Sequence, residues 1–310
     1  MLSTRLDSVL TKFSARQRTA IKIEALHSYP LKTSQATVQL YDSGSANPCV
    51  ILVPDGPNVI ANYARLIGLL KDRFRVVCFD MPGFGYSAPD PDYDHSLNKG
   101  AATVIAVMDE LKISTATLAF SCANGFYALR VAQLAPHRVS RLFLSQTPSL
   151  AAMHAWSRRV VPYVLHLPVL GQAIGWLARR KAAGSWYAHA LPKGSDTTAM
   201  KNPALHSLDN GGCFCLAGVV QGLEREDVDA LHGVTTPCTL VWGAMDRSHK
   251  LTDPQSMLML VPHAEIIQFQ DCGHFPDLEQ PERFANILIE RMDEALASSE
   301  IARSCEETAC

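Results

Sequence analysis

The sequence has almost no excess charge of either sign. Its 30 acidic side chains nearly balance its 28 basic ones, for a formal net charge of −2 over 310 residues. A basic stripe with interleaved aromatics is lacking, as is any known nucleic-acid motif, so no nucleic-acid partner is expected. The 47% of residues that are hydrophobic are enough to bury a large core.

Signals for export and for membrane insertion are also lacking. Residues 1–19 have no apolar run of the kind that a secretory signal needs, and a weak amphipathic helix is the alternative there. Residues 160–178 carry no formal charge, but Pro162, Pro168 and Gly171 argue against a single membrane-spanning helix. Two short helices facing a pocket are expected instead, with weak interfacial membrane contact as the lesser alternative.

Metal-ligand spacing is absent from the cysteines. Nine of them are spread over expected strands and loops, which indicates reduced thiols and a cytoplasmic location. We therefore expect no metal and no cofactor. Nothing in the sequence indicates the oligomeric state.

A strand that turns into a helix is predicted over residues 117–136. An apolar run is followed by small residues at helical spacing, and Pro136 ends the helix. Ser121 and Cys122 lie between the two elements. Such a turn holds a nucleophile on a strained backbone position, next to helix N–H groups that can bind an oxyanion.

This stretch resembles the nucleophile turn of the α/β-hydrolase superfamily, and the resemblance extends over about residues 36–297. Residues 80–87 match the turn Asp-x-Pro-Gly-x-Gly-x-Ser of that family, in which Asp80 is expected to accept local N–H bonds. The resemblance implies an α/β fold with a mostly parallel eight-stranded sheet, flanking helices and an inserted helical cap. The implied division is an extension over 1–35, core segments over 36–149 and 235–297, and a cap over 150–234. A disordered tail is expected over 298–310.

The turn can be aligned with the family in two registers. Cys122 at the apex places Gly125 and the later alanines on the face that the family packs against its sheet, although Phe120 and Asn124 then occupy flanks that are usually small. With Ser121 at the apex, both flanking residues are small, as in the family. The helix is then rotated by about 100° relative to the family. We favour Cys122 as the nucleophile and keep Ser121 as the alternative. The helix dipole is expected to lower the pKa of the Cys122 thiol.

The remaining site residues follow from the resemblance. Asp246 comes after one expected strand and His274 after the last, in the order nucleophile, acid, histidine. The Ala123 N–H is the expected oxyanion donor. In the same loop Asp55 replaces the histidine of the family. Pro57 stands where the family has its second donor, so that donor is Gly56 or Asn58, or it is missing.

The expected activity is hydrolysis of an ester, thioester or lactone of a small apolar molecule through an acyl-Cys122 intermediate. Two alternatives stay open at this point. One is carbon–carbon bond hydrolysis or a lyase-type reaction in the same fold, and the other is a non-catalytic ligand-binding protein.

Overall fold

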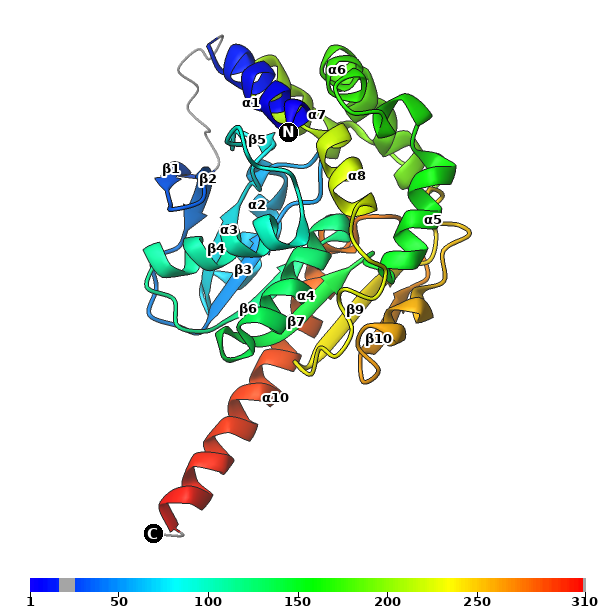
Figure 1. Cartoon of the computed structure of the whole chain (residues 1–310). Coiled ribbons are helices and arrows are strands. Elements are labelled where there is room, and N and C mark those ends of the chain that lie inside the picture. The colour runs from blue at the N-terminus through cyan, green and yellow to red at the C-terminus, as the bar shows by residue number, and fades with distance from the viewer. Residues whose placement is uncertain (17–25, 309–310) are drawn as a thin grey trace.

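An eight-stranded sheet forms the centre of the molecule (Figure 1). The structure is a computed structural model that describes residues 1–16 and 26–308. The strands lie in the order β1-β2-β4-β3-β6-β7-β9-β10, and every pair from β4 to β10 is parallel, whereas β2 is antiparallel to both β1 and β4. The predicted fold class is confirmed. The strands are β1 (Tyr29–Lys32), β2 (Thr37–Asp42), β3 (Cys49–Val53), β4 (Arg75–Phe79), β6 (Ala116–Phe120), β7 (Val139–Ser145), β9 (Cys238–Gly243) and β10 (Glu265–Phe269).

Helices cover both faces of the sheet. Alternate side chains of β3 enter different cores, Val50 and Leu52 on one face and Ile51 and Val53 on the other, because side chains alternate along a strand. The Ile51 face packs against α3 (Leu97–Glu110) and α4 (Gly125–Leu134), and the Val50 face packs against α2 (Ala64–Leu70) and α10 (Pro281–Thr308). This double covering explains why the central strands are continuous apolar runs.

A group of helices between β7 and β9 lies over one end of the sheet (Figure 1). A two-stranded ladder of β5 (Phe84–Gly85) and β8 (Cys213–Phe214) joins it to the core. Its place in the chain fits the helical cap expected over 150–234, whose limits stay a prediction. The helices are α5 (Leu150–Val160), α6 (Leu170–Ala190), α7 (Thr198–Asp209) and α8 (Leu216–Glu224).

The N-terminal helix α1 (Leu2–Ala15) packs against α6 and α8. Ser14 Oγ accepts a hydrogen bond of 2.9 Å from Trp176 Nε1, and the ring of Phe13 meets the same indole edge-on. The apolar pattern of residues 20–26 also predicts a strand, but all of this stretch except residue 26 lies outside the described residues. The expected α1 is present, and it is docked on the helical group rather than isolated.

The chain ends in a longer helix than expected. The disordered tail predicted over 298–310 is corrected, because α10 continues as far as Thr308; residues 309–310 lie outside the described part. Six of the thirteen residues beyond 297 are Glu, Ala or Arg, which favour helix without burial. Within the described residues, no helix has both the length and the apolar character needed to cross a membrane.

Candidate active site

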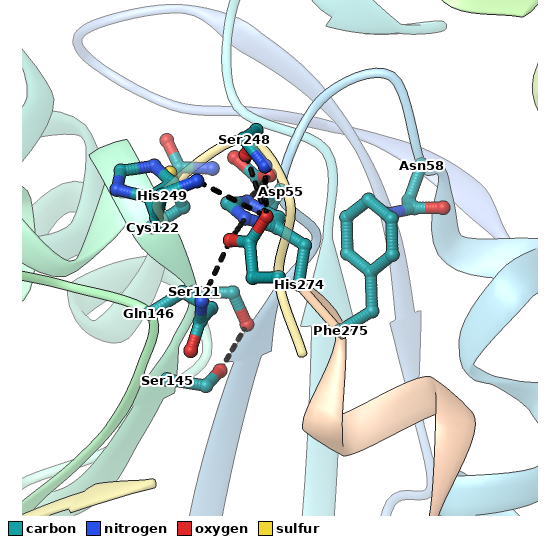
Figure 2. Close-up of polar contacts among 12 residues, drawn as sticks. Asp55, Asn58, Ser121, Cys122, Ser145, Gln146, Ser248, His249, His274 and Phe275 are labelled. Carbon is teal, nitrogen blue, oxygen red and sulfur yellow. Dashed lines mark hydrogen bonds and ion pairs between the residues drawn. The ribbon is translucent and has the colours of Figure 1, made fainter. Parts of the chain in front are cut away.

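Four loops at the carboxyl ends of parallel strands bring the site together (Figure 2). Asp55 follows β3, Cys122 follows β6, Asp246 follows β9, and His274 follows β10. Parallel strands end at one edge of a sheet, so residues far apart in the sequence meet there. Three of these four residues were predicted from the sequence; Asp55 was not assigned a role.

Cys122 occupies the strained turn. Its φ is +51°, whereas Ser121 is extended with φ −114°. The next residues form a 3₁₀ turn, Cys122–Asn124, that leads into α4. A Cβ built on Gly125 would lie 2.2 Å from Thr147 Oγ1, and that hydroxyl donates to the Cys122 carbonyl over 2.9 Å. Only glycine allows this approach, and its position three residues after Cys122 corresponds to the cysteine register.

Ser121 points into a different environment. Its hydroxyl donates to Asp277 Oδ2 over 2.6 Å and lies 2.8 Å from Ser145 Oγ, as Figure 2 shows for the serine pair. Tyr63 Oη donates to the same carboxylate oxygen over 2.6 Å. Burial raises the pKa of Asp277. This buried cluster, which the sequence did not indicate, fixes Ser121 below the turn and away from the cavity described below.

His274 is fully buried and lies between two carboxylates (Figure 2). Its Nδ1 is 2.6 Å from Asp246 Oδ2, and its Nε2 is 3.2 Å from Asp55 Oδ2. Burial acts to lower the pKa of His274, but the charges of Asp246 and Cys122 and the hydrogen bonds to Asp246 and Asp55 together raise that pKa well above its ordinary value. Burial likewise acts to raise the pKa of Asp246, yet the charge and hydrogen bond of His274 bring it below its usual range.

Gln146 and Ser248 hold Asp246 in place. Gln146 Nε2 donates to Asp246 Oδ2 over 2.7 Å, while its Oε1 accepts the Gly243 N–H over 2.7 Å. Ser248 donates to Oδ1 through both its N–H and its hydroxyl, at 2.8 and 2.7 Å. No role was predicted for Gln146 from the sequence. Its position directly after β7 is the signal that could have suggested a supporting role.

Asp55 stands where the resembling family has a histidine. It is buried, and burial raises its pKa against the lowering effect of its hydrogen bond to His274. Asp55 therefore occupies the imidazole nitrogen that a nucleophile would use. Sequence reasoning noted this replacement but did not predict the contact.

The predicted oxyanion donors have different outcomes. The Asn58 N–H donates to Asp55 O over 2.9 Å, so it is already used, and Figure 2 shows Asn58 away from Cys122; its assignment as an oxyanion donor is corrected. Gly56 and Ala123 both border the cavity beside Cys122. The Ala123 N–H makes a hydrogen bond that favours the Cys122 thiolate.

The expected low pKa of the Cys122 thiol is also corrected. Burial and the nearby Asp55 together raise this pKa to about 11, because His274 and the Ala123 N–H only partly oppose them. Burial removes more stabilisation from the thiolate, by taking away its hydration, than the dipole of a short helix provides. Cys122 is consequently a thiol at rest.

Cys122 borders an apolar cavity of about 340 Å³ between the sheet and the overlying helices. Its lining includes Phe84 and Phe214, which meet edge-on, and Trp156 and Trp186, which do the same. Trp186 also meets the His274 ring edge-on, at 5.3 Å between ring centroids. Among the described residues that line this cavity there is no lysine or arginine. The cavity suits an uncharged apolar ligand.

His249 is a further buried residue beside the site. It stacks on Trp156 with ring centroids 4.7 Å apart, and it offers a donor atom within 4.8 Å of Cys122 Sγ and a His274 nitrogen. These three residues could approach one metal ion. Both His274 nitrogens already contact carboxylates, however, so this group fits proton transfer better than metal binding.

The model of the alpha/beta hydrolase family matches residues 50–287, which is most of the chain. The chain belongs to the alpha/beta hydrolase family. Among relatives of this alpha/beta hydrolase, the 2-hydroxymuconate semialdehyde hydrolase of a Pseudomonas species is 25% identical, over 84% of this chain and 92% of that protein. The 3-oxoadipate enol-lactonase 2 of Acinetobacter baylyi is 23% identical, over 73% and 81%. The pimeloyl-[acyl-carrier protein] methyl ester esterase of Photobacterium profundum is 28% identical, over 74% and 88%.

Solved structures show the same fold. Epoxide hydrolase A of Mycobacterium thermoresistibile superposes with a TM-score of 0.73 at 16% identity, over 86% of this chain and 97% of that one. The enol-lactonase of Burkholderia xenovorans has a TM-score of 0.65 at 16% identity, over 86% and 100%. At such identities the likeness shows the fold alone.

Proposed function

We propose that this alpha/beta hydrolase cleaves an uncharged ester, thioester or lactone through an acyl-Cys122 intermediate. The observation that carries the proposal is the position of Cys122, at a strained turn on an apolar cavity and within 4.8 Å of a His274 nitrogen. Asp246 fixes the tautomer of His274 by accepting from Nδ1. This is the arrangement that nucleophilic acyl transfer requires.

The reaction proceeds in two halves. The Cys122 thiol gives its proton to His274 Nε2 as the sulfur bonds to the substrate carbonyl carbon. The bond from that carbon to the leaving oxygen or sulfur then breaks, and His274 returns the proton to the leaving group. A water molecule, deprotonated by His274, attacks the thioester; the carboxylic acid leaves and the thiol is restored.

Asp55 takes part by exchanging partners. At rest the Asp55–His274 pair shares one proton between Oδ2 and Nε2, and the raised pKa values of both groups keep that proton bound. When the substrate enters, the protonated Asp55 donates its hydrogen bond to the substrate carbonyl oxygen instead of to His274. The Cys122 thiol then donates to His274 Nε2. A neutral carboxylic acid then donates to the oxyanion beside the Ala123 N–H, where Pro57 has no N–H to offer.

Carbon–carbon bond hydrolysis is the second candidate, and the relatives favour it. Several are named hydrolases of semialdehydes or dienoates, which contain no ester bond. Muconates and dienoates carry a carboxylate, however, and the described lining of this cavity offers Asp55 and Glu224 but no lysine or arginine. The lining therefore favours the uncharged acyl substrate.

The decisive experiment is intermediate trapping. The parent protein is mixed with p-nitrophenyl esters and acyl thioesters of increasing chain length, and the reaction is quenched in acid. The masses of the tryptic peptides are then measured by mass spectrometry. An acyl adduct on Cys122, absent from Cys122→Ala and present in Cys213→Ala, supports the proposal. Turnover of a 2-hydroxy-6-oxodienoate without ester turnover would favour the second candidate. Saturable binding of the esters with no turnover of either class would indicate a non-catalytic ligand-binding protein.

The cytoplasmic location stays a prediction.

A further inference from the structure

A second buried cluster lies apart from the active site, where α1, the core and the overlying helices meet. Asp7 comes from α1, His95 precedes α3, and Cys215 precedes α8. All three residues are buried, and each offers one donor atom within 4.8 Å of the other two. A carboxylate, an imidazole and a thiol converge here from positions without any motif spacing.

His95 aims a nitrogen into this cluster without a partner. The residue is 1% exposed, and its Nε2 has no hydrogen-bond partner among the described residues. Its backbone has φ +57° and is held by Tyr127, whose hydroxyl donates to His95 O over 3.0 Å. A buried polar atom without a partner costs about 1–3 kcal/mol. The strained backbone and the unpartnered nitrogen together indicate that something outside the chain completes the site.

Asp7 is a buried carboxylate without a basic partner. Gln172 Nε2 is 3.5 Å from its Oδ2, and the Cys215 thiol forms a hydrogen bond with it. No lysine or arginine of the described residues forms an ion pair with Asp7. Buried carboxylates in proteins are normally paired with a charge or bound to a metal.

Two glycines pack directly against the three side chains, at positions where a larger residue would collide with them. A Cβ built on Gly218 would lie 2.6 Å from His95 Nε2 and 2.8 Å from Asp7 Oδ2. A Cβ built on Gly83 would lie 2.7 Å from His95 Cε1 and 3.0 Å from the Cys215 Cβ. A small cavity of about 20 Å³, bordered by Asp7 and Cys215, adjoins the cluster and has room for one water.

We propose that Asp7, His95 and Cys215 bind Zn²⁺, with a water molecule as the fourth ligand. Zinc takes mixed sulfur, nitrogen and oxygen ligands at about 2.0–2.3 Å, so neighbouring ligands of a tetrahedral site lie roughly 3.3–3.8 Å apart. Closing the cluster from within 4.8 Å needs only small side-chain movements. Binding releases the Cys215 thiol proton to solvent, and the ion ties α1 to the core and to α8.

The test uses full-length protein with Cys122→Ala, because Cys122, His249 and His274 form a second group that could take a metal. Metal-free protein is titrated with Co²⁺ and then with Zn²⁺. We expect one Co²⁺ per chain, a thiolate-to-cobalt charge-transfer band and its loss on displacement by Zn²⁺. Zn²⁺ should also raise the Tm.

Three further variants make the test specific. In Cys215→Ser the charge-transfer band should disappear, and the Kd for Zn²⁺ should rise at least tenfold. Gly218→Ala should weaken binding similarly, because its methyl occupies the space beside His95 Nε2. Cys213→Ser should bind as the parent does, since that thiol instead contacts Gly85 O and Ser87 O at 3.4 and 3.5 Å. Absence of saturable binding, or unchanged binding in Cys215→Ser, would overturn the proposal; if Gly218→Ala does not fold, Cys215→Ser decides.

Discussion

His274 Nε2 lies 3.2 Å from Asp55 Oδ2, and not in hydrogen-bond contact with a serine hydroxyl. The two residues are 219 positions apart in the sequence and meet because β3 and β10 end at the same edge of the sheet. The imidazole is therefore bonded to a carboxylate on each side. This arrangement makes Asp55 a part of the proton balance of the site, because the nucleophile has to compete with it for Nε2.

We expect Asp55→Asn and Asp55→Ala to behave differently. An amide can still donate to the oxyanion, whereas alanine cannot, so Asp55→Ala should lower kcat by about 10²–10³. In the parent, kcat should fall as rising pH ionises Asp55 through its raised pKa. Asp55→Asn should lack that descending limb. Steady-state pH profiles of the three proteins provide the measurement, and near-parental kcat in Asp55→Ala would contradict the proposed role.

Cys122→Ala and Ser121→Ala separate the two candidate nucleophiles. Cys122→Ala should lower kcat/KM by at least about 10³, because no other nucleophile borders the cavity at the strained turn. Ser121→Ala should keep kcat within a few-fold but lose about 1–3 kcal/mol of unfolding free energy, since it removes a hydroxyl bonded to the buried Asp277. Urea denaturation and ester hydrolysis measure both effects. A dead Ser121→Ala enzyme of unchanged stability would reverse the assignment.

Local sequence patterns carried enough information for the fold and for the order of the site residues. Each central strand is an apolar run, and the turn at residues 80–87 could be assigned from its glycines and Asp80, which accepts N–H bonds from Ile60 and Tyr86 as expected. The spacing of Gly125 indicated the cysteine register because the face of a helix on which a residue lies depends only on its spacing along the chain.

Contacts between distant segments could not be predicted in the same way. Asp55 reaches His274, and Gln146 reaches Asp246, through loops whose relative position depends on the whole sheet. The Asn58 N–H was counted as a donor because a sequence cannot show that the Asp55 carbonyl already accepts it. The pKa of Cys122 was misjudged for a related reason: a helix start is visible in sequence, and the depth of burial is not.

Gln146→Ala should impair catalysis without touching substrate. Its loss removes the donor to Asp246 Oδ2 and leaves the buried Gly243 N–H unpaired, so we expect kcat to fall about 10-fold or more with little change in KM, and stability to drop by about 1–3 kcal/mol. Gln133→Ala is the matched control, because Gln133 donates to the His232 carbonyl at an exposed position. A larger effect on KM than on kcat would argue against a positioning role.

The alkylation rate of Cys122 should report its electrostatic surroundings. Iodoacetamide reacts with the thiolate. Below a pKa of about 11, the ionised fraction of the thiol grows about tenfold for each unit by which the pH rises. The rate in the parent should therefore rise from pH 7 to pH 10 without a plateau.

Removing the Asp55 charge should shift this profile. The Asp55 carboxylate raises the pKa of Cys122, so in Asp55→Asn the thiolate forms at lower pH, and the rate at pH 9 should exceed that of the parent. Cys238 serves as the internal control: burial raises its pKa to about 12, it lies within β9, and it should stay unlabelled until the protein unfolds. Peptide mass spectrometry assigns the label to each cysteine. A rate that levels off below pH 8 in the parent would mean that Cys122 rests as a thiolate paired with His274, and the partner exchange proposed for Asp55 would then be unnecessary.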